Sequence, residues 1–267
     1  MNGVIFKETL RRNWRGMLIW AGIIGLDAVY SVYLVQNSEL LQKYSEILKS
    51  MPSFIMGMVG GADAQFAASP EGFLGIGYYG WVLLGIAAYA VVAGLNITAN
   101  EEDRGIMDVM LSMPVPRWRV IVEKFAAYAL LIIGMALSAH LILVASTVIW
   151  ASKPFNQGRL LESTLNMLPA ALFVLAFTAL ISVILRRRST ATSIAAGFVA
   201  ISYLIDVVGR SAQSADVLRR VSFYSYYDGV TVLQYGLQWG NVLGLLGLAV
   251  LMVIGTVFLF QRRDIGL

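Results

Sequence analysis

Residues 164–208 read TLNMLPAALFVLAFTALISVILRRRSTATSIAAGFVAISYLIDVV. Two mainly apolar runs, 164–185 and 189–208, are separated by three consecutive arginines, Arg186, Arg187 and Arg188. A helix needs about 20 apolar residues to cross the roughly 30 Å hydrocarbon core of a bilayer. The stretch therefore predicts two transmembrane helices joined by a tight turn, with the arginines held at the membrane surface.

The composition of the whole chain supports the same fold class. Of its 267 residues, 58% are hydrophobic and 13% are charged, whereas a soluble domain carries about a quarter charged residues. The apolar excess must therefore face lipid. We predict one domain, an all-α integral membrane protein with six transmembrane helices at about 17–35, 79–99, 125–150, 164–185, 189–208 and 240–260.

Several kinds of chemistry are excluded by the residue types present. The chain has no cysteine, which excludes disulfides, thiolate metal sites and a cysteine nucleophile. A single histidine, His140, cannot form a histidine-rich metal cluster. There is also no Gly-Lys dipeptide, so the phosphate-cradling P-loop is missing. We therefore expect a chain that is not an enzyme, hydrolyses no ATP itself and needs no cofactor or metal of its own. The net charge of +4 is weak evidence for nucleic-acid binding, and we expect no nucleic-acid partner.

The distribution of basic residues predicts the orientation of the chain. With the N-terminus inside, thirteen of the 20 lysines and arginines fall in segments 1–16, 100–124, 186–188 and 261–267. The other seven fall in the outer segments, which are longer. Basic residues are enriched on the cytoplasmic side of membrane proteins. We therefore expect both termini to be cytoplasmic, in a multi-pass protein of the prokaryotic plasma (inner) membrane.

Two segments outside the predicted spans have amphipathic patterns. Residues 4–16 mix apolar side chains with bases, as in a helix that lies on the surface of an anionic leaflet. Residues 39–51 repeat apolar side chains at helical spacing, which predicts a surface helix on the outer side. The glycine-rich stretch 57–77 is expected to be an outer loop. An aromatic group suits the outer headgroup level: Phe223, Tyr224, Tyr226, Tyr227, Tyr235 and Trp239.

The most unusual polar segment is residues 100–119, NEEDRGIMDVMLSMPVPRWR. It begins with three acids, Glu101, Glu102 and Asp103, at the end of a predicted span. A short run with apolar residues at helical spacing follows, and two prolines then break it before Arg117. A solvated loop is the ordinary interpretation of such a charged segment. The alternative is a compact helix and turn that presents acids and a small apolar face to the cytosol.

The pattern Glu-Glu-x-Arg-Gly-x(5)-Leu-Ser-x-Pro-Val-x-Arg in this segment resembles the cytoplasmic loop of ABC-2 type transporter permeases. The likeness extends to outer-loop residues 60–73, to Phe223–Asp228 before the last span, and to the ending 258–265. It implies a type V exporter-like transmembrane domain that pairs with a second permease, identical or related. Two separate cytoplasmic ATPase subunits, which bind ATP and Mg²⁺, would drive it.

The resemblance also implies that loop 100–119 couples the chain to the ATPase. Charged contacts would come from Glu101, Glu102 and Arg104, and packing contacts from Met107, Met110 and Leu111. Gly105, Pro114 and Arg117 complete the matching positions. ATP binding would then tilt the helices and switch the pathway from inward-facing to outward-facing.

Individual polar residues within the spans give weaker signals. Asp27 lies near the middle of the first span, where a carboxylate suggests a substrate pathway, a gate or a contact between subunits. His140 is expected to be a hydrogen-bonded packing residue. Asp206 and Arg210 are one helical turn apart and are expected to pair at the outer end.

Three other functions remain open at this stage: a stand-alone secondary transporter or channel, a polytopic membrane enzyme, and a permease relative that acts mainly as a sensor or assembly scaffold. A stand-alone secondary transporter would show inverted repeats and several intramembrane charges, and a polytopic membrane enzyme would need converging acids or Ser–His pairs. The spans here are largely uncharged. The substrate, the direction of transport and the choice between homodimer and heterodimer are left open by the sequence, although the resemblance favours export.

Overall fold

The computed structural model of the protein describes residues 3–52, 55, 64–105, 107, 115–150, 154–185, 187–211 and 216–262. Over these residues the chain is helical and contains no strand. Six helices of the described part are long and apolar enough to cross a membrane. They are Val4–Gln36, Pro70–Leu95, Arg117–Trp150, Gln157–Leu185, Arg188–Arg210 and Trp239–Gln261. The prediction of an all-α protein with six transmembrane helices is confirmed.

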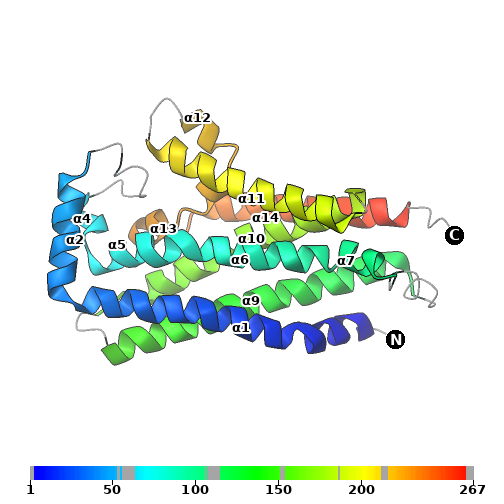
Figure 1. Ribbon diagram of the computed structural model, residues 1–267, viewed down its shortest axis with the longest axis horizontal. Helices are drawn as coiled ribbons and strands as arrows, with labels where there is room; N and C mark the ends of the chain where they lie inside the picture. Colours follow the sequence, from blue (N-terminus) through cyan, green and yellow to red (C-terminus); the bar gives the residue numbers. More distant parts are fainter. Residues whose placement is uncertain are drawn as a thin grey trace.

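The long helices lie side by side along the long axis of the molecule (Figure 1). α1 (Val4–Gln36) packs along α9 (Arg117–Trp150), and this pair forms one side of the bundle. α10 (Gln157–Leu185) lies in the centre and contacts α6 (Gly80–Leu95), α9, α11 (Arg188–Ser211) and α14 (Trp239–Gln261). The start of α1 and the end of α14 lie at the same end of the bundle, which we call the N-terminal end.

The first span is longer than the sequence predicts. Residues 4–16, expected as a helix lying on the membrane surface, instead form the first turns of the same continuous helix as the span. α1 has 33 residues, and at 1.5 Å per residue it is about 50 Å long, well beyond the roughly 30 Å of hydrocarbon. Its basic first turns, with Arg11, Arg12 and Arg15 exposed, therefore reach past the apolar layer.

The second span begins inside the stretch that was expected to be an outer loop. Ser69 caps a short helix, α5 (Pro70–Leu74), by accepting a hydrogen bond from the Gly72 backbone N at 3.0 Å. Serine at the N-cap followed by proline at the first helical position is a strong start signal. One π-helical turn, η1 (Gly75–Tyr79), then leads into α6. The Ser-Pro pair therefore begins a helix here.

The opposite end of the bundle carries the second predicted amphipathic helix. α2 (Ser38–Ser50) follows α1 after Asn37, whose side chain caps it by accepting from the Glu39 and Leu40 backbone N atoms. α2 stands at an angle to the bundle axis beside α4 (Ala64–Ala67) and α5 (Figure 1). The expected helix at 39–51 is thus confirmed.

An ionic network lies near the end of α11, at the end of the bundle opposite the N-terminal end. The expected pair is present, with the Arg210 Nη2 atom 2.8 Å from Asp206 Oδ2. Arg219, at the end of α12 (Asp216–Arg219), adds a second contact to Asp206 at 3.3 Å. Both arginines also approach Asp228, at 3.6 and 3.8 Å, which caps α13 (Gly229–Tyr235). The network joins three helices, whereas the sequence indicated a single pair.

The aromatic group at 223–239 divides between core and surface. Tyr235 and Trp239 are about two-thirds exposed, as expected for residues at the headgroup level. Phe223 and Tyr224, on the short helix η3 (Phe223–Tyr226), are each 3% exposed and belong to the hydrophobic core, as does Tyr227. These three side chains therefore do not face lipid, since η3 packs against α10 and α11, and their depth at the headgroup level stays a prediction.

A close approach of two spanning helices, α6 and α10, supplies a test of this packing. A Cβ atom at Gly94 of α6 would lie 2.6 Å from Thr178 Cβ and 3.0 Å from the Leu175 carbonyl oxygen of α10. We expect Gly94→Ala to destabilise the protein by about 1–3 kcal/mol through overpacking, measured by unfolding in mixed detergent micelles. Gly22→Ala is the matched control, because nothing lies within 4 Å of its Cβ position. Equal stability of the two variants would contradict this helix contact.

Candidate functional site

The polar segment after the second span forms a short helix held against the bundle. α7 (Ala99–Asp103) follows α6 and ends at Arg104, after which Gly105 adopts φ +67°. A positive φ is easily adopted only by glycine, so this residue sets the direction of the turn. The next helix, α9, begins at Arg117. Three of the predicted coupling residues, Met110, Leu111 and Pro114, lie outside the described residues.

A buried ion pair fixes α7 to α9. The Lys124 ammonium contacts the Glu101 carboxylate and also donates a hydrogen bond to the Ile97 carbonyl oxygen at 3.2 Å. The side chain of Lys124 is 3% exposed and that of Glu101 is 19% exposed. Lys124 was expected to be one of the bases of a loop spanning 100–124. It lies instead two turns inside α9, so that expectation is corrected.

Such a pair is informative because neither charge tolerates burial alone. Moving an ion out of water costs several kcal/mol, which only a well-placed partner offsets. The ammonium of Lys124 has both an opposite charge and a carbonyl oxygen. The position of α7 is therefore tied to that of α9, since separating them would leave the charge of a buried lysine side chain unpaired.

Glu123, the residue before Lys124, holds the start of α1 against α9. The Glu123 carboxylate accepts hydrogen bonds from the backbone N atoms of Gly3, Ile5 and Phe6 at 3.1, 3.1 and 3.2 Å. These are N–H groups that the first turn of a helix leaves unpaired, and a negative charge there also suits the helix dipole. Two adjacent residues of α9 thus hold both α1 and α7.

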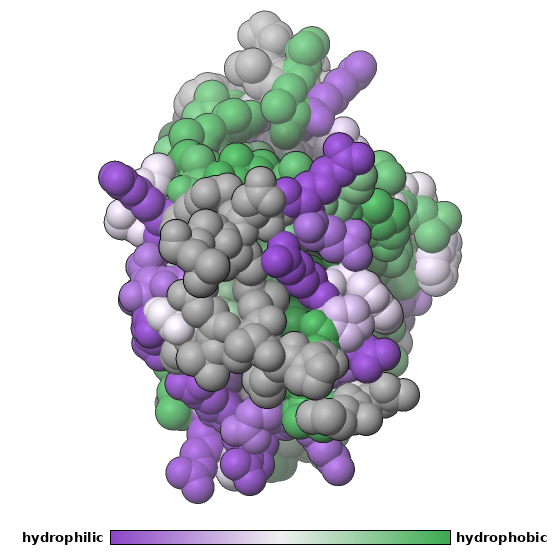
Figure 2. Space-filling model, turned by 90° about the vertical axis from the view of Figure 1, so that its right-hand side faces the viewer, coloured by the Kyte–Doolittle hydropathy of each residue, from purple (hydrophilic) through white to green (hydrophobic). Residues whose placement is uncertain are grey.

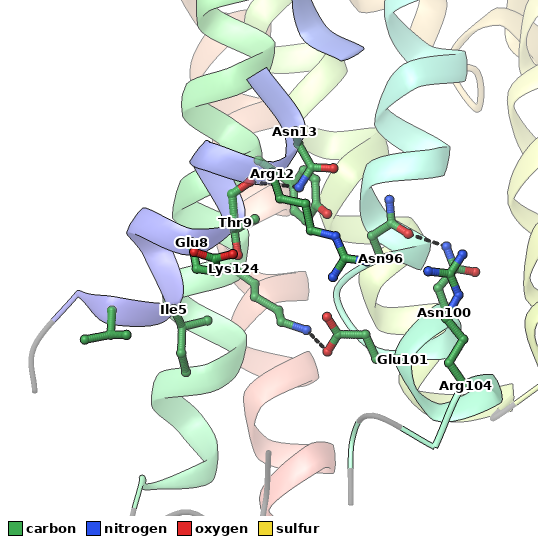
Figure 3. Close-up of a pocket in the computed structure, with 12 residues that line it drawn as sticks. Ile5, Glu8, Thr9, Arg12, Asn13, Asn96, Asn100, Glu101, Arg104 and Lys124 are labelled. Carbon is green, nitrogen blue, oxygen red and sulfur yellow. Dashed lines mark hydrogen bonds and ion pairs between the residues drawn. The ribbon is translucent and has the colours of Figure 1, made fainter. Parts of the chain in front are cut away.

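A polar cavity of about 470 Å³ lies between these three elements. Its walls are the first turns of α1, the end of α6 with α7, and Lys124 and Tyr128 of α9. Arg12 extends from α1 towards Asn96, while Lys124 reaches from α9 to Glu101 (Figure 3). Viewed onto the N-terminal end, hydrophilic side chains project from much of the surface, and apolar side chains are visible beside and behind them (Figure 2).

The other predicted coupling residues are divided between surface and interior. Arg104 and Gly105 are exposed, and Glu102 and Arg117 are half-buried. Met107 is 3% exposed and belongs to the core of the chain itself. Among the described residues of the segment, the exposed side chains are mainly charged, and Met107 and Glu101 hold α7 and the turn after it against the bundle.

Asp27 occupies an exposed position on α1. It lies beside Leu26 and Tyr30, which are 69% and 60% exposed, while Ala21, Ile24 and other mainly apolar residues form the packed face of the helix. Within the described part of the chain, Asp27 has no hydrogen bond or ion pair. A single chain thus leaves an unpaired carboxylate near the middle of a spanning helix.

A buried polar chain crosses the core and was not foreseen from the sequence. His140 Nδ1 lies 3.0 Å from Thr164 Oγ1, consistent with the expected packing role. Thr164 is in turn 3.3 Å from the Tyr79 hydroxyl, which donates to the Leu160 carbonyl oxygen at 2.8 Å. The Tyr227 hydroxyl donates to the Tyr79 carbonyl oxygen at 2.9 Å. Burial raises the pKa of Tyr227, so its hydroxyl stays a neutral donor.

No group of three or more His, Cys, Asp or Glu side chains within the described residues could hold a metal ion. A family model described as ABC-2 family transporter protein matches residues 8–265 of the chain. Comparison with curated proteins gives no match.

The contribution of the Glu101 charge to stability can be tested with a substitution that keeps the size of the side chain. We expect Glu101→Gln to lower the free energy of unfolding by about 3 kcal/mol, because it leaves the Lys124 charge unpaired. Asp103→Asn, an exposed acid two residues away on α7, is the control and should change stability by less than about 0.5 kcal/mol. Unfolding in mixed micelles measures both.

A double variant completes the same experiment. Glu101→Gln combined with Lys124→Met removes both charges, and replacing a buried pair with neutral groups is often nearly neutral. We therefore expect the double variant to be more stable than Glu101→Gln alone. Additive losses from the two substitutions would show that the two side chains do not interact.

Proposed function

The chain belongs to the ABC-2 family of transporter proteins, and we propose that two such permeases form the membrane pathway of an exporter driven by a separate ATPase. Membership in this family makes the chain a membrane permease of an ATP-binding cassette transporter, and its six spanning helices agree with that role. The observation that carries the proposal is the family match over nearly the whole chain, together with the ion pair that holds α7 against α9.

The proposed docking surface for the ATPase is the segment 100–119 at the N-terminal end of the bundle. Its support is the run of acids on α7, the exposed Arg104 and the turn at Gly105. The excess of bases in the segments on this side favours a cytoplasmic position for this end and for both termini, in the plasma membrane of a prokaryote. Two ATPase subunits would bind ATP and Mg²⁺.

The connections of α9 supply a mechanism for transmitting movement. A force on α7 acts directly on α9 through Glu101 and Lys124. Because Glu123 holds the first turn of α1, α1 moves with α9. Closure of the ATPase dimer would then tilt α1 and α9 as one unit relative to α10, α11 and α14, and this tilt would open the pathway to the outer side.

Asp27 supports the pairing of two permeases. An unpaired carboxylate costs several kcal/mol in contact with hydrocarbon, so its face of α1 requires water or polar groups. A second copy of the chain or a related permease, with a water-filled pathway between the two, would supply them. We therefore assign Asp27 to the pathway or the contact between permeases.

The docking assignment predicts the effect of a charge reversal on α7. Glu102→Lys should reduce recovery of the ATPase with the tagged chain by about tenfold, because it places a base in an acidic docking surface. Glu46→Lys, on an exposed position of α2 at the opposite end, should leave recovery unchanged. The measurement is co-purification from the native membrane, with the amount of inserted chain as reference.

Two outcomes would contradict this assignment. Normal recovery of the ATPase with Glu102→Lys would remove the segment from the interface. Recovery of the wild-type chain alone after mild solubilisation would favour a stand-alone transporter and overturn the proposal as a whole.

The position proposed for Asp27 can be tested by cysteine chemistry. Because the chain contains no cysteine, Asp27→Cys creates a single reactive thiol. We expect a charged, water-soluble thiol reagent to modify it at least about tenfold faster than Leu251→Cys, on an α14 residue that is 65% exposed, because a thiol in contact with hydrocarbon does not form the reactive thiolate. Equally slow labelling of both would place Asp27 against lipid.

A further inference from the structure

The polar cavity at the N-terminal end has more positive charge than its own acids balance. Three basic side chains line it, Arg12, Arg104 and Lys124. Glu101 pairs with Lys124, so these two charges cancel. The other lining acid, Glu8, lies 3.3 Å from Arg11, which is outside the cavity. The guanidinium groups of Arg12 and Arg104 therefore remain, and neither has a hydrogen bond or ion pair with any residue that the structure describes.

A second observation is that a side chain in the cavity wall has a buried polar atom without a hydrogen-bond partner. Asn100 is 7% exposed and lines the cavity. Its Nδ2 group donates to Asn96 Oδ1, but its own Oδ1 atom is buried with no hydrogen-bond partner in the described structure. An unsatisfied buried acceptor costs about 1–3 kcal/mol. A molecule that fills this cavity would gain from offering both an anion and a hydrogen-bond donor.

The position of the cavity along the bundle axis corresponds to the surface layer of the membrane. Trp14 on α1 and Trp118 on α9 are 45% and 42% exposed, and each has an arginine over its ring. Exposed tryptophans with basic neighbours mark the interfacial layer of a bilayer. Trp14 lies within one turn of Arg12 on the same helix. The cavity therefore opens at the level of lipid headgroups, and Val4, which is 54% exposed, provides an apolar part of its rim.

We propose that this cavity binds the headgroup of a membrane phospholipid, with Arg12 and Arg104 on the phosphate and Asn100 accepting from a headgroup hydroxyl or ammonium. Guanidinium groups match phosphate oxygens in geometry as well as charge, and basic pockets between spanning helices suit lipid headgroups. The bound lipid joins α1 to α7 beside the ion pair, so it stabilises the unit formed by α1, α7 and α9. This site does not depend on the presence of an ATPase.

The test uses the purified full chain in detergent after removal of native lipid. Dioleoyl phosphatidylglycerol is added, and native mass spectrometry follows the lipid-bound fraction against lipid concentration. We expect one site that Arg12→Gln weakens by at least about tenfold, through loss of a charge-assisted contact. Arg15→Gln is the matched control, because it removes the same charge from the same helix outside the cavity. Its affinity should stay within about twofold.

Further ligands distinguish the source of binding. Dioleoylglycerol has the same acyl chains without a phosphate, and it should not occupy the site. If it binds equally well, the cavity recognises acyl chains and the proposal is overturned. If inorganic phosphate displaces the lipid with the same dependence on Arg12, the ligand is a soluble anion and not a lipid. Equal loss in Arg12→Gln and Arg15→Gln would reduce the effect to general surface charge and would also overturn the proposal.

Discussion

The ion pair between Glu101 and Lys124 is the constraint on which the N-terminal end of the molecule depends. A lysine side chain with 3% exposure needs a fixed partner, and the only acid that the structure places against it comes, within the described residues, from α7. The path of the chain after the second span is thereby determined, because α7 must return to α9. The helix α7 is held against the bundle by this electrostatic requirement as well as by packing.

The same logic extends along α9. The Glu123 carboxylate accepts hydrogen bonds from the free N–H groups of α1, and its neighbour Lys124 pairs with Glu101 of α7. Since these residues are adjacent, α1 and α7 cannot shift independently of α9 without exposing buried polar groups. At the other end, Asp206 and Asp228 bind two arginines and join α11, α12 and α13. The molecule is thus fixed by ionic contacts at both ends, with mainly apolar packing and one satisfied polar chain between them.

Much of the fold follows from the sequence, and the misses have identifiable physical causes. The six spans follow from the length of their apolar runs, and the run of arginines marks the break between α10 and α11. The start of the second span was missed because Ser69-Pro70 marks both turns and helix N-termini. The candidate site was only partly predictable. The acids of α7 are visible in the sequence, but Lys124 resembles a surface base there, and only the tertiary structure pairs it with a residue 23 positions earlier.

The exposed surfaces of the spanning helices differ in whether lipid can solvate them. α14 and α11 are among the least buried spans: 17% and 28% of their most apolar stretches are buried by the rest of the protein. Exposure of apolar side chains is no argument for a partner in a membrane, because lipid solvates leucine as well as another helix does. A carboxylate is different, since lipid cannot solvate it. Asp27 therefore distinguishes α1 from the more apolar α14, and it supports the proposal that a second permease or a water-filled pathway covers this face of α1.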